Sequence, residues 1–179
     1  MKRDKNQEAK MDDRAIMETY KKLATPGGQH KSLARLEGHW DTKNKSWSGP
    51  DNPPQESTGT CELKMLLGGR YLQQECSGQM MGSPFNGVGV IGYDNNTKKY
   101  VSTWMDSMST GIHFFEGAGS DDGKSFSQES CYDDAVQGRM KWRAVTKIVD
   151  DNTFVFEMYG VRNKGKEEKM MEMTYNRRQ

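Results

Sequence analysis

The fold of this chain is decided by residues 84–108, which read PFNGVGVIGYDNNTKKYVSTWMDSM. Two runs rich in Val, Ile, Tyr and Trp, residues 86–93 and 99–106, flank a polar segment, Asp94-Asn95-Asn96-Thr97. β-branched and aromatic residues suit a pleated strand, whereas Asn and Asp tolerate the backbone angles of a tight turn. The stretch therefore predicts a β-hairpin in the middle of one continuous antiparallel sheet.

The same alternation of short strands and turn residues continues on both sides of this hairpin. Every connection is too short for a helical crossover, so neighbouring strands should pair antiparallel. An open sheet of this size would leave two long unpaired edges, and closing it removes both. We therefore predict an all-β fold, a closed up-and-down antiparallel barrel of about ten strands. The predicted strands are 38–48, 56–67, 70–80, 86–93, 99–107, 110–118, 124–131, 139–149, 153–160 and 167–177.

Two predicted helical segments precede the first strand. Residues 12–24 place Ile16, Tyr20 and Leu23 on one helical face, and an aspartate at the start can cap the helix. Residues 31–36 predict a shorter helical turn that could plug one end of a barrel. The chain then divides into a disordered tail over residues 1–11, a helical segment over 12–36 and a β-barrel domain over 37–179.

Composition limits the classes of partner. The chain has 179 residues, a formal charge of +1 and 13 methionines. The balanced charge gives no case for nucleic acid as a partner. No apolar run is long enough to cross a bilayer, and no secretory signal is visible, so the expected compartment is cytoplasmic by default and exported if a leader was removed. The methionines suit adaptable core filling or, alternatively, a pliable ligand pocket.

Three cysteines are too few to predict a disulfide framework. If Gly68-Gly69 is a two-residue turn, Cys61 lies directly opposite Cys76. Counting from that turn places the two cysteines in a hydrogen-bonded pair, the wider of the two antiparallel kinds. A disulfide across such a pair would be strained, so we expect two neighbouring thiols.

The two ends of the predicted barrel resemble those of lipocalin-like proteins. The first strand opens with Gly38-His39-Trp40, a Gly-x-Trp motif, and the last strand ends near Arg177 and Arg178. Lipocalin-like proteins pair such a Trp with a basic residue of the closing strand. The resemblance implies that Trp40 contacts Arg177 or Arg178, a cation over an aromatic face, at the closed end of the barrel.

A closer resemblance covers residues 33–178. It rests on the segments at residues 66–72, 92–95, 100–108 and 155–159, which read LLGGRYL, GYDN, YVSTWMDSM and VFEMY. These segments resemble a bacterial family of lipocalin-like domains of uncharacterised function. The resemblance implies a calycin-type barrel and brings no activity, substrate or catalytic residue. Many members of that family are exported, which fits the second of the two expected compartments.

Metal and cofactor chemistry find little support in the residue pattern. The histidines are His30, His39 and His113, no two of them at zinc-ligand spacing, and no Cys-x-x-Cys occurs. We predict no metal site and no cofactor, with haem as an alternative because it needs a single axial histidine. The segment Gly87-Val88-Gly89 lies within a strand, so it is not a dinucleotide fingerprint. Gly89 instead should face Trp104 and make room for its indole.

The candidate site consists of aromatic and polar residues that strand alternation could place inside the barrel. Trp104 and Asp106 share one face of their strand, whereas Trp142 and Arg143 lie on opposite faces, so only one of that second pair can point inward. The alternative is that the charged residues face solvent around a filled interior. The predicted ligand-binding residues are Tyr93, Trp104, Asp106, His113, Arg143 and Glu157.

The function predicted from this pattern is non-catalytic binding of a small, partly apolar ligand inside the barrel. One alternative is an enzyme, a hydrolase or isomerase, which would need a carboxylate of raised pKa in an open cavity. Another is an interaction module, with a homodimer as one outcome, which would need a large exposed apolar patch.

Overall fold

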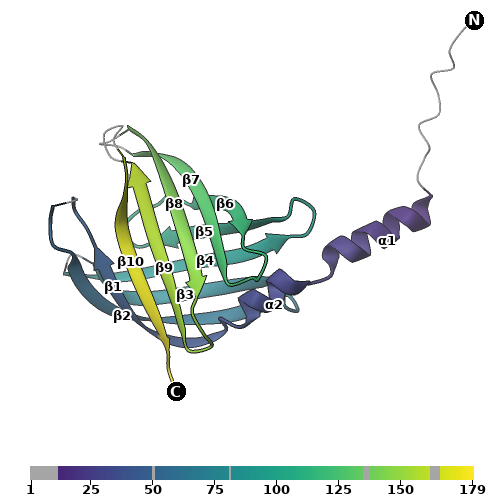
Figure 1. Cartoon of the computed structure of the whole chain (residues 1–179), viewed down its shortest axis with the longest axis horizontal. Coiled ribbons are helices and arrows are strands. Elements are labelled where there is room, and N and C mark those ends of the chain that lie inside the picture. The colour runs from purple at the N-terminus through teal and green to yellow at the C-terminus, as the bar shows by residue number, and fades with distance from the viewer. Residues whose placement is uncertain (1–11, 50, 81, 135–137, 162–165) are drawn as a thin grey trace, which may run out of the picture.

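A computed structural model of the chain describes residues 12–49, 51–80, 82–134, 138–161 and 166–179, and it forms a closed barrel (Figure 1). Neighbouring strands pair antiparallel, and the last pairs with the first. The predicted closed ten-stranded fold is confirmed, whereas the tail predicted over residues 1–11 lies outside the described residues. The strands are β1 (Gly38–Ser46), β2 (Gln55–Leu66), β3 (Tyr71–Met80), β4 (Ser83–Asp94), β5 (Lys99–Asp106), β6 (His113–Gly119), β7 (Ser125–Asp134), β8 (Gly138–Ile148), β9 (Thr153–Val161) and β10 (Glu167–Arg177).

Two strand starts differ from the prediction by about three residues. β4 begins at Ser83 rather than at residue 86, because its pairing with β3 continues to the hairpin end. β6 begins at His113 rather than at residue 110. The backbone amide of Met108 donates to the Asp106 carboxylate at 2.9 Å, and this local turn takes the chain out of the β5–β6 ladder before β6 starts.

In the described residues, two helices precede the barrel. α1 (Asp13–Ala24) begins after Asp12, whose carboxylate accepts a hydrogen bond from the amide of Arg14 at 3.4 Å, and none of its residues is buried. Figure 1 shows α1 projecting away from the strands, while α2 (Gly28–Ala34) lies against the barrel. Neither described helix is long and apolar enough to span a lipid bilayer.

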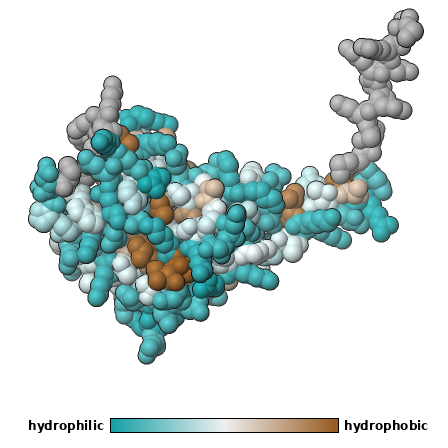
Figure 2. All heavy atoms as spheres, in the orientation of Figure 1, coloured by the Kyte–Doolittle hydropathy of each residue, from teal (hydrophilic) through white to brown (hydrophobic). Residues whose placement is uncertain are grey.

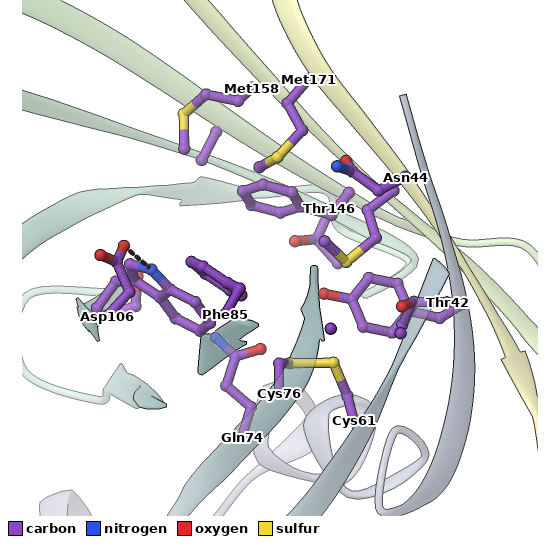
Figure 3. A pocket seen from close by; sticks show the side chains of 18 of the residues that line it. Thr42, Asn44, Cys61, Gln74, Cys76, Phe85, Asp106, Thr146, Met158 and Met171 are labelled. Carbon is purple, nitrogen blue, oxygen red and sulfur yellow. Dashed lines mark hydrogen bonds between the residues drawn. A yellow bond between two sulfur atoms is a disulfide. The ribbon is translucent and has the colours of Figure 1, made fainter. Parts of the chain in front are cut away.

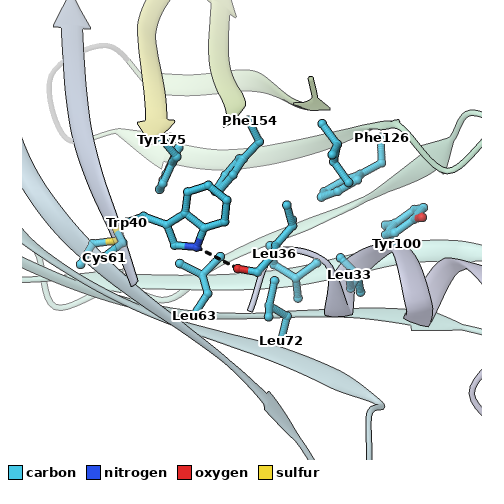
Figure 4. Packing of buried hydrophobic residues seen from close by; sticks show 13 residues of the cluster. Leu33, Leu36, Trp40, Cys61, Leu63, Leu72, Tyr100, Phe126, Phe154 and Tyr175 are labelled. Atoms are coloured by element: carbon cyan, nitrogen blue, oxygen red, sulfur yellow. Dashed lines mark hydrogen bonds between the residues drawn. A yellow bond between two sulfur atoms is a disulfide. The ribbon is translucent and has the colours of Figure 1, made fainter. Parts of the chain in front are cut away.

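The core fills the end of the barrel at which β1 begins (Figure 4). Leu33 of α2 and Leu36 after it are almost fully buried there, as the predicted plug requires. The indole of Trp40 donates from Nε1 to the carbonyl oxygen of Leu36 at 2.9 Å. Trp40 meets the ring of Phe154 edge to face, and Phe154 stacks on Tyr175 with ring centres 3.9 Å apart. Hydrophobic burial therefore seals this end.

Arg177 closes the seam between β10 and β1. It pairs with Trp40 in the strand register, and its guanidinium carbon lies 4.2 Å from the centre of the Trp40 ring. Its Nη1 and Nη2 donate to the carbonyl oxygens of Glu37 and Arg35, each at 2.6 Å. Arg178 instead pairs with the Asp41 carboxylate at the surface. The cation over the indole is thus Arg177.

Cys61 and Cys76 form a disulfide, so the prediction of two free thiols is wrong. The predicted register is correct, because Cys61 does face Cys76. The error lies in the turn, since Leu66 pairs with Tyr71 and leaves four residues, 67–70, in the connection. With four turn residues in place of two, Cys61 and Cys76 change from a wide, hydrogen-bonded pair to a narrow, non-hydrogen-bonded pair. The distance of 4.1 Å between their Cα atoms fits the narrow pair.

Candidate ligand-binding site

The barrel encloses a cavity of about 350 Å³, whose lining includes residues from all ten strands (Figure 3). Leu36 and Leu63 lie toward the plugged end, and Met80, Met108 and His113 lie at the other end of the strands. The lining is mainly apolar, with a limited number of polar side chains. Cavities of this size and character hold small molecules in proteins.

Trp104 lies flat against the inner wall because two glycines make room for it. A Cβ atom added to Gly87 would lie 2.2 Å from Cζ2 of Trp104, and one added to Gly89 would lie 2.9 Å from Cε3. Gly89 is the register partner of Trp104, as the sequence predicted. The Gly87-Val88-Gly89 segment is therefore a cradle for an indole, and this packing keeps the ring from filling the cavity.

Asp106 is held in place by two donors. The indole Nε1 of Trp104 donates to its Oδ2 at 3.0 Å, and the amide of Met108 donates to its Oδ1 at 2.9 Å. Figure 3 shows the Asp106 carboxylate on one side of the cavity with the first of these bonds. In the described part of the chain, Asp106 is the one carboxylate that lines the cavity.

Three aromatic side chains cluster near the same end of the barrel. His113 stacks on Trp142 with ring centres 5.6 Å apart, and Tyr132 meets both rings edge to face. His113 and Trp142 line the cavity. Within the described residues, no group of three His, Cys, Asp or Glu side chains is arranged to hold a metal ion.

Among the residues that the structure describes, six methionines line the cavity. One of these residues, Met170, is the extra residue of a β-bulge between Lys169 and Met171, which brings two consecutive methionines to the cavity. Flexible thioether side chains adapt to irregular apolar shapes. These methionines border the cavity, which is where a pliable ligand pocket would need them. The cavity methionines are Met80, Met108, Met158, Met170, Met171 and Met173.

Two polar atoms of cavity-lining residues have no hydrogen-bond partner among the described residues. Asn44 donates from Nδ2 to the hydroxyl of Ser57 at 3.3 Å, but its Oδ1 is unpartnered. The indole Nε1 of Trp142 is likewise unpartnered. A buried polar group left unsatisfied costs about 1–3 kcal/mol, so these two atoms reduce the stability of the fold. Both are covered by neighbouring atoms, so neither faces the free space of the cavity.

Tyr93 belongs to the plugged end rather than to the cavity. Its ring meets His30 of α2 edge to face at 5.8 Å and Tyr100 at 5.1 Å. It lines a separate hollow of about 330 Å³ beside the α1–α2 connection. The imidazole Nδ1 of His30 accepts from the amide of Gly27 at 3.0 Å, and burial lowers the pKa of that imidazole. Tyr93 therefore helps to anchor α2.

Arg143 and Glu157 lie on the outer face of the barrel, which corrects the prediction that they anchor a ligand inside. Strand alternation places Trp142 and Ala144 at the cavity, so Arg143 points outward and makes a two-pronged ion pair with Glu167. Phe156 and Met158 face the cavity on β9, so Glu157 between them also points outward.

Glu157 is nevertheless buried, because neighbouring side chains cover it. Its side chain is 8% exposed, and Lys147 and Lys169 each donate to its carboxylate at 2.7 Å. The hydroxyl of Tyr159 donates at 3.0 Å. Burial alone would raise the pKa of Glu157, but these three hydrogen bonds outweigh it and lower the pKa to about 2. Glu157 is thus an ionised structural group.

Sequence reasoning missed most of the polar lining. Thr42 and Asn44 follow Trp40 at two-residue spacing, so an inward Trp40 places both inside. That signal was available in the Gly-x-Trp motif. Gln74 and the Cys61–Cys76 disulfide also line the cavity. Of the six predicted residues, Trp104, Asp106 and His113 line the cavity, whereas Tyr93, Arg143 and Glu157 do not.

Comparisons with known proteins agree with this fold. Rv2717c of M. tuberculosis superimposes with a TM-score of 0.62 at 11% sequence identity, over 87% of this chain and 100% of that one. The S-type phycobiliprotein lyase CPES of Guillardia theta superimposes with a TM-score of 0.55 at 11% identity, over 86% of this chain and 98% of that one. At such identities the likeness concerns the fold alone. No curated protein matches the chain.

A family model matches residues 25–177, which include α2 and every strand of the barrel. It is described as a protein of unknown function, DUF1579. The match covers the plugged end, the seam and the cavity, and it agrees with the resemblance to an uncharacterised lipocalin-like family. This chain forms a closed, calycin-like barrel, and it belongs to the DUF1579 family.

Proposed function

We propose that this protein binds a small, partly apolar molecule inside the barrel and performs no chemistry on it. The observation that carries the proposal is the cavity of about 350 Å³, which remains between the strands although one end is packed with side chains. A barrel of this class has room for one small ligand, and pockets of about 300–1,000 Å³ are the usual size for small molecules.

The lining supports the same proposal. Met158, Met171 and Phe156 offer apolar contact, while Gln74 and Asp106 offer polar groups. A ligand that combined an apolar body with a few polar groups would satisfy both kinds of surface. Such a division between many apolar contacts and few polar ones is typical of small-molecule sites.

The enzyme alternative receives less support. Asp106, the carboxylate that lines the cavity in the described residues, accepts a hydrogen bond on each oxygen, and these bonds hold it to Trp104 and to the turn after β5. The strongly perturbed carboxylate, Glu157, lies on the outer face and its pKa is lowered. One protein of similar fold is named as a lyase, but at 11% identity that name is not a guide to this chain.

A thermal-shift screen tests the proposal. The probes are fatty acids, haem and small aromatic compounds, each with the full chain. A ligand at 100 times its Kd adds about 2.7 kcal/mol, which corresponds to roughly 5–10 °C in Tm for a domain of this size. A shift of that order with one class supports the proposal, and the absence of any shift with every class refutes it.

Two matched variants locate the binding. Ala144→Phe places a large ring at a buried position of the cavity wall, whereas Val88→Phe adds a ring at an exposed position of β4. Ala144→Phe should abolish the shift, and Val88→Phe should preserve it. Binding that survives Ala144→Phe unchanged would place the ligand outside the barrel.

A second candidate function, self-association through α1, rests on the exposure of its apolar residues. Met17 is 57% and Tyr20 is 64% exposed, and the helix projects from the barrel. Figure 2 shows hydrophobic residues along this helix and further hydrophobic patches on the barrel. Light scattering of the full chain and of Tyr20→Glu tests this candidate: a dimer that dissociates in the variant supports it, and a monomer in both refutes it.

A further inference from the structure

We infer that the cavity selects a ligand that carries a positively charged amine, and that Asp106 is the anchor for that amine. This inference rests on the proposed function, because it names the chemical class of ligand for the same cavity. It goes further, since it assigns a charge to the ligand and a role to one residue. The anchoring group, its surroundings and the charge of the whole lining each contribute to the argument.

The charge of the lining is the first observation. Among the described residues that line the cavity, none is Lys or Arg, and Asp106 carries the one formal charge apart from any on His113. An anionic group would meet a negative charge here without a basic partner. A cationic group would meet its counter-charge in a region partly shielded from water, where the attraction is stronger than in bulk solvent.

The geometry of Asp106 is the second observation. Trp104 and the Met108 amide together occupy one lone pair on each carboxylate oxygen. An ionised carboxylate has about four such positions, so acceptor capacity remains on both oxygens. Asp106 forms no ion pair with a described Lys or Arg, whereas Glu157 and Glu167 on the outer face do. The charge of Asp106 therefore lacks a fixed counter-charge in the described residues.

The rigidity of this arrangement is the third observation. Trp104 cannot swing toward β4, because its ring already occupies the space in which a Cβ atom at Gly87 or Gly89 would lie. Its indole thus holds the carboxylate in one orientation before any ligand arrives. A preorganised acceptor costs less to bind than one that must first be ordered.

The aromatic surroundings are the fourth observation. Phe85, Trp104 and Trp142 line the same cavity as Asp106. The faces of such rings attract cations, most strongly when water is excluded. A carboxylate together with aromatic faces suits an organic ammonium group, and the methionine wall suits the apolar body attached to it. The ligand class is therefore an amine with an alkyl or aryl body.

The simpler role for Asp106 is to cap the turn after β5, which its bond to the Met108 amide also serves. The two roles differ in charge dependence. A turn cap needs an acceptor and no charge, so Asp106→Asn would preserve it in large part. An ammonium anchor needs the negative charge, so the same change would remove the preference for a cation.

The test compares three probes with one alkyl body, octylammonium, octan-1-ol and octanoate, by calorimetry on the full chain. We expect octylammonium to bind about ten-fold more tightly than octan-1-ol, equivalent to about 1.4 kcal/mol, and octanoate to bind more weakly than either. In Asp106→Asn, octylammonium and octan-1-ol should bind within about two-fold of each other. Glu62→Gln removes the same charge from the outer face of β2 and should keep the preference.

Trp104→Phe provides a second variant in case Asp106→Asn does not fold. It keeps the carboxylate and an aromatic ring but removes the donor that orients Asp106, so octylammonium should lose more affinity than octan-1-ol and the preference should fall below ten-fold. Equal binding of the three probes to the unchanged protein, or a preference that survives Asp106→Asn, would overturn the inference and leave the proposed function standing. Failure of all three probes, together with a negative thermal-shift screen, would overturn both.

Discussion

Arg177 lies over Trp40, with 4.2 Å between its guanidinium carbon and the ring centre, and this contact joins the last strand of the barrel to the first. The same guanidinium donates to the backbone carbonyl oxygens of Arg35, Glu37 and Asp151. These carbonyls belong to the segment after α2 and to the β8–β9 turn. One side chain therefore ties together the plug, the seam and a neighbouring hairpin.

Removing this side chain should destabilise the whole barrel. Arg177→Ala loses three charge-assisted hydrogen bonds and a cation–π contact, which we expect to lower the free energy of unfolding by about 3 kcal/mol. Arg177→Lys keeps the charge but not the planar fork, so its effect should be intermediate. Urea unfolding followed by tryptophan fluorescence measures both.

Arg178→Ala is the matched control for that experiment. Its pair with Asp41 has side chains that are 53% and 58% exposed, so the change should cost less than about 1 kcal/mol. If Arg177→Ala were no more destabilising than Arg178→Ala, the role assigned to Arg177 would be wrong.

Gly87→Ala should displace Trp104 from the wall. The added Cβ would lie 2.2 Å from the indole, so the ring must move into the cavity or the strands must separate. We expect a loss of about 1–3 kcal/mol, as for other overpacked interiors, together with weaker ligand binding. Val88→Ala alters the exposed face of the same strand and should change stability by less than about 0.5 kcal/mol. Normal binding by Gly87→Ala would contradict the cradle.

The disulfide makes a chemical prediction. Alkylation of the native protein without reductant should label Cys131, which is exposed and free, but neither Cys61 nor Cys76. Reduction opens a loop whose ends are 15 residues apart, so we expect it to lower the free energy of unfolding by about 3 kcal/mol. Labelling of all three cysteines in the unreduced, folded protein would show that the bond does not form.

Glu157 predicts a specific loss of stability in acid. Its pKa is about 2 in the folded protein, against an ordinary value of 4.5. A group with a lowered folded pKa stabilises the protein above its unfolded pKa and loses that effect as pH falls toward the folded value. The contribution, on the order of 3 kcal/mol from the shift, should therefore disappear progressively as pH falls from about 4.5 to about 2.

Urea unfolding at a series of pH values tests this prediction. Glu157→Gln should be less stable at neutral pH and should show a shallower decline between pH 4.5 and 2 than the unchanged protein. Glu62→Gln removes a charge from an exposed site and leaves Glu157 in place, so the steep decline should persist. Equal declines in all three proteins would contradict the assignment.

The sequence predicted some members of the site and misplaced others for identifiable reasons. Trp104, Asp106 and His113 line the cavity as expected. Arg143 and Glu157 do not, because two-residue alternation divides a strand into two faces without saying which face is inward. The bulge at Met170 breaks the alternation itself, so that Met170 and Met171 both reach the cavity.

The disulfide shows the same limit at a turn. The register between Cys61 and Cys76 followed from the position of the glycines, but the kind of pair depended on whether the turn has two residues or four. In the structure, Leu67, Gly68 and Gly69 have positive φ angles and lie in a four-residue turn. A difference of two residues in the turn was therefore enough to change the expected thiols into a disulfide.

The sequence by itself determined the order, number and antiparallel pairing of the strands, because turn residues and short connections act locally. Its resemblance to lipocalin-like proteins also predicted that the Trp of the Gly-x-Trp motif meets an arginine of the last strand. Only the tertiary structure decided which faces turn inward, that space remains between them, and that Asp106 lies in that space without a basic partner among the described residues. These properties depend on the packing of all ten strands around one axis, and no single segment contains that information.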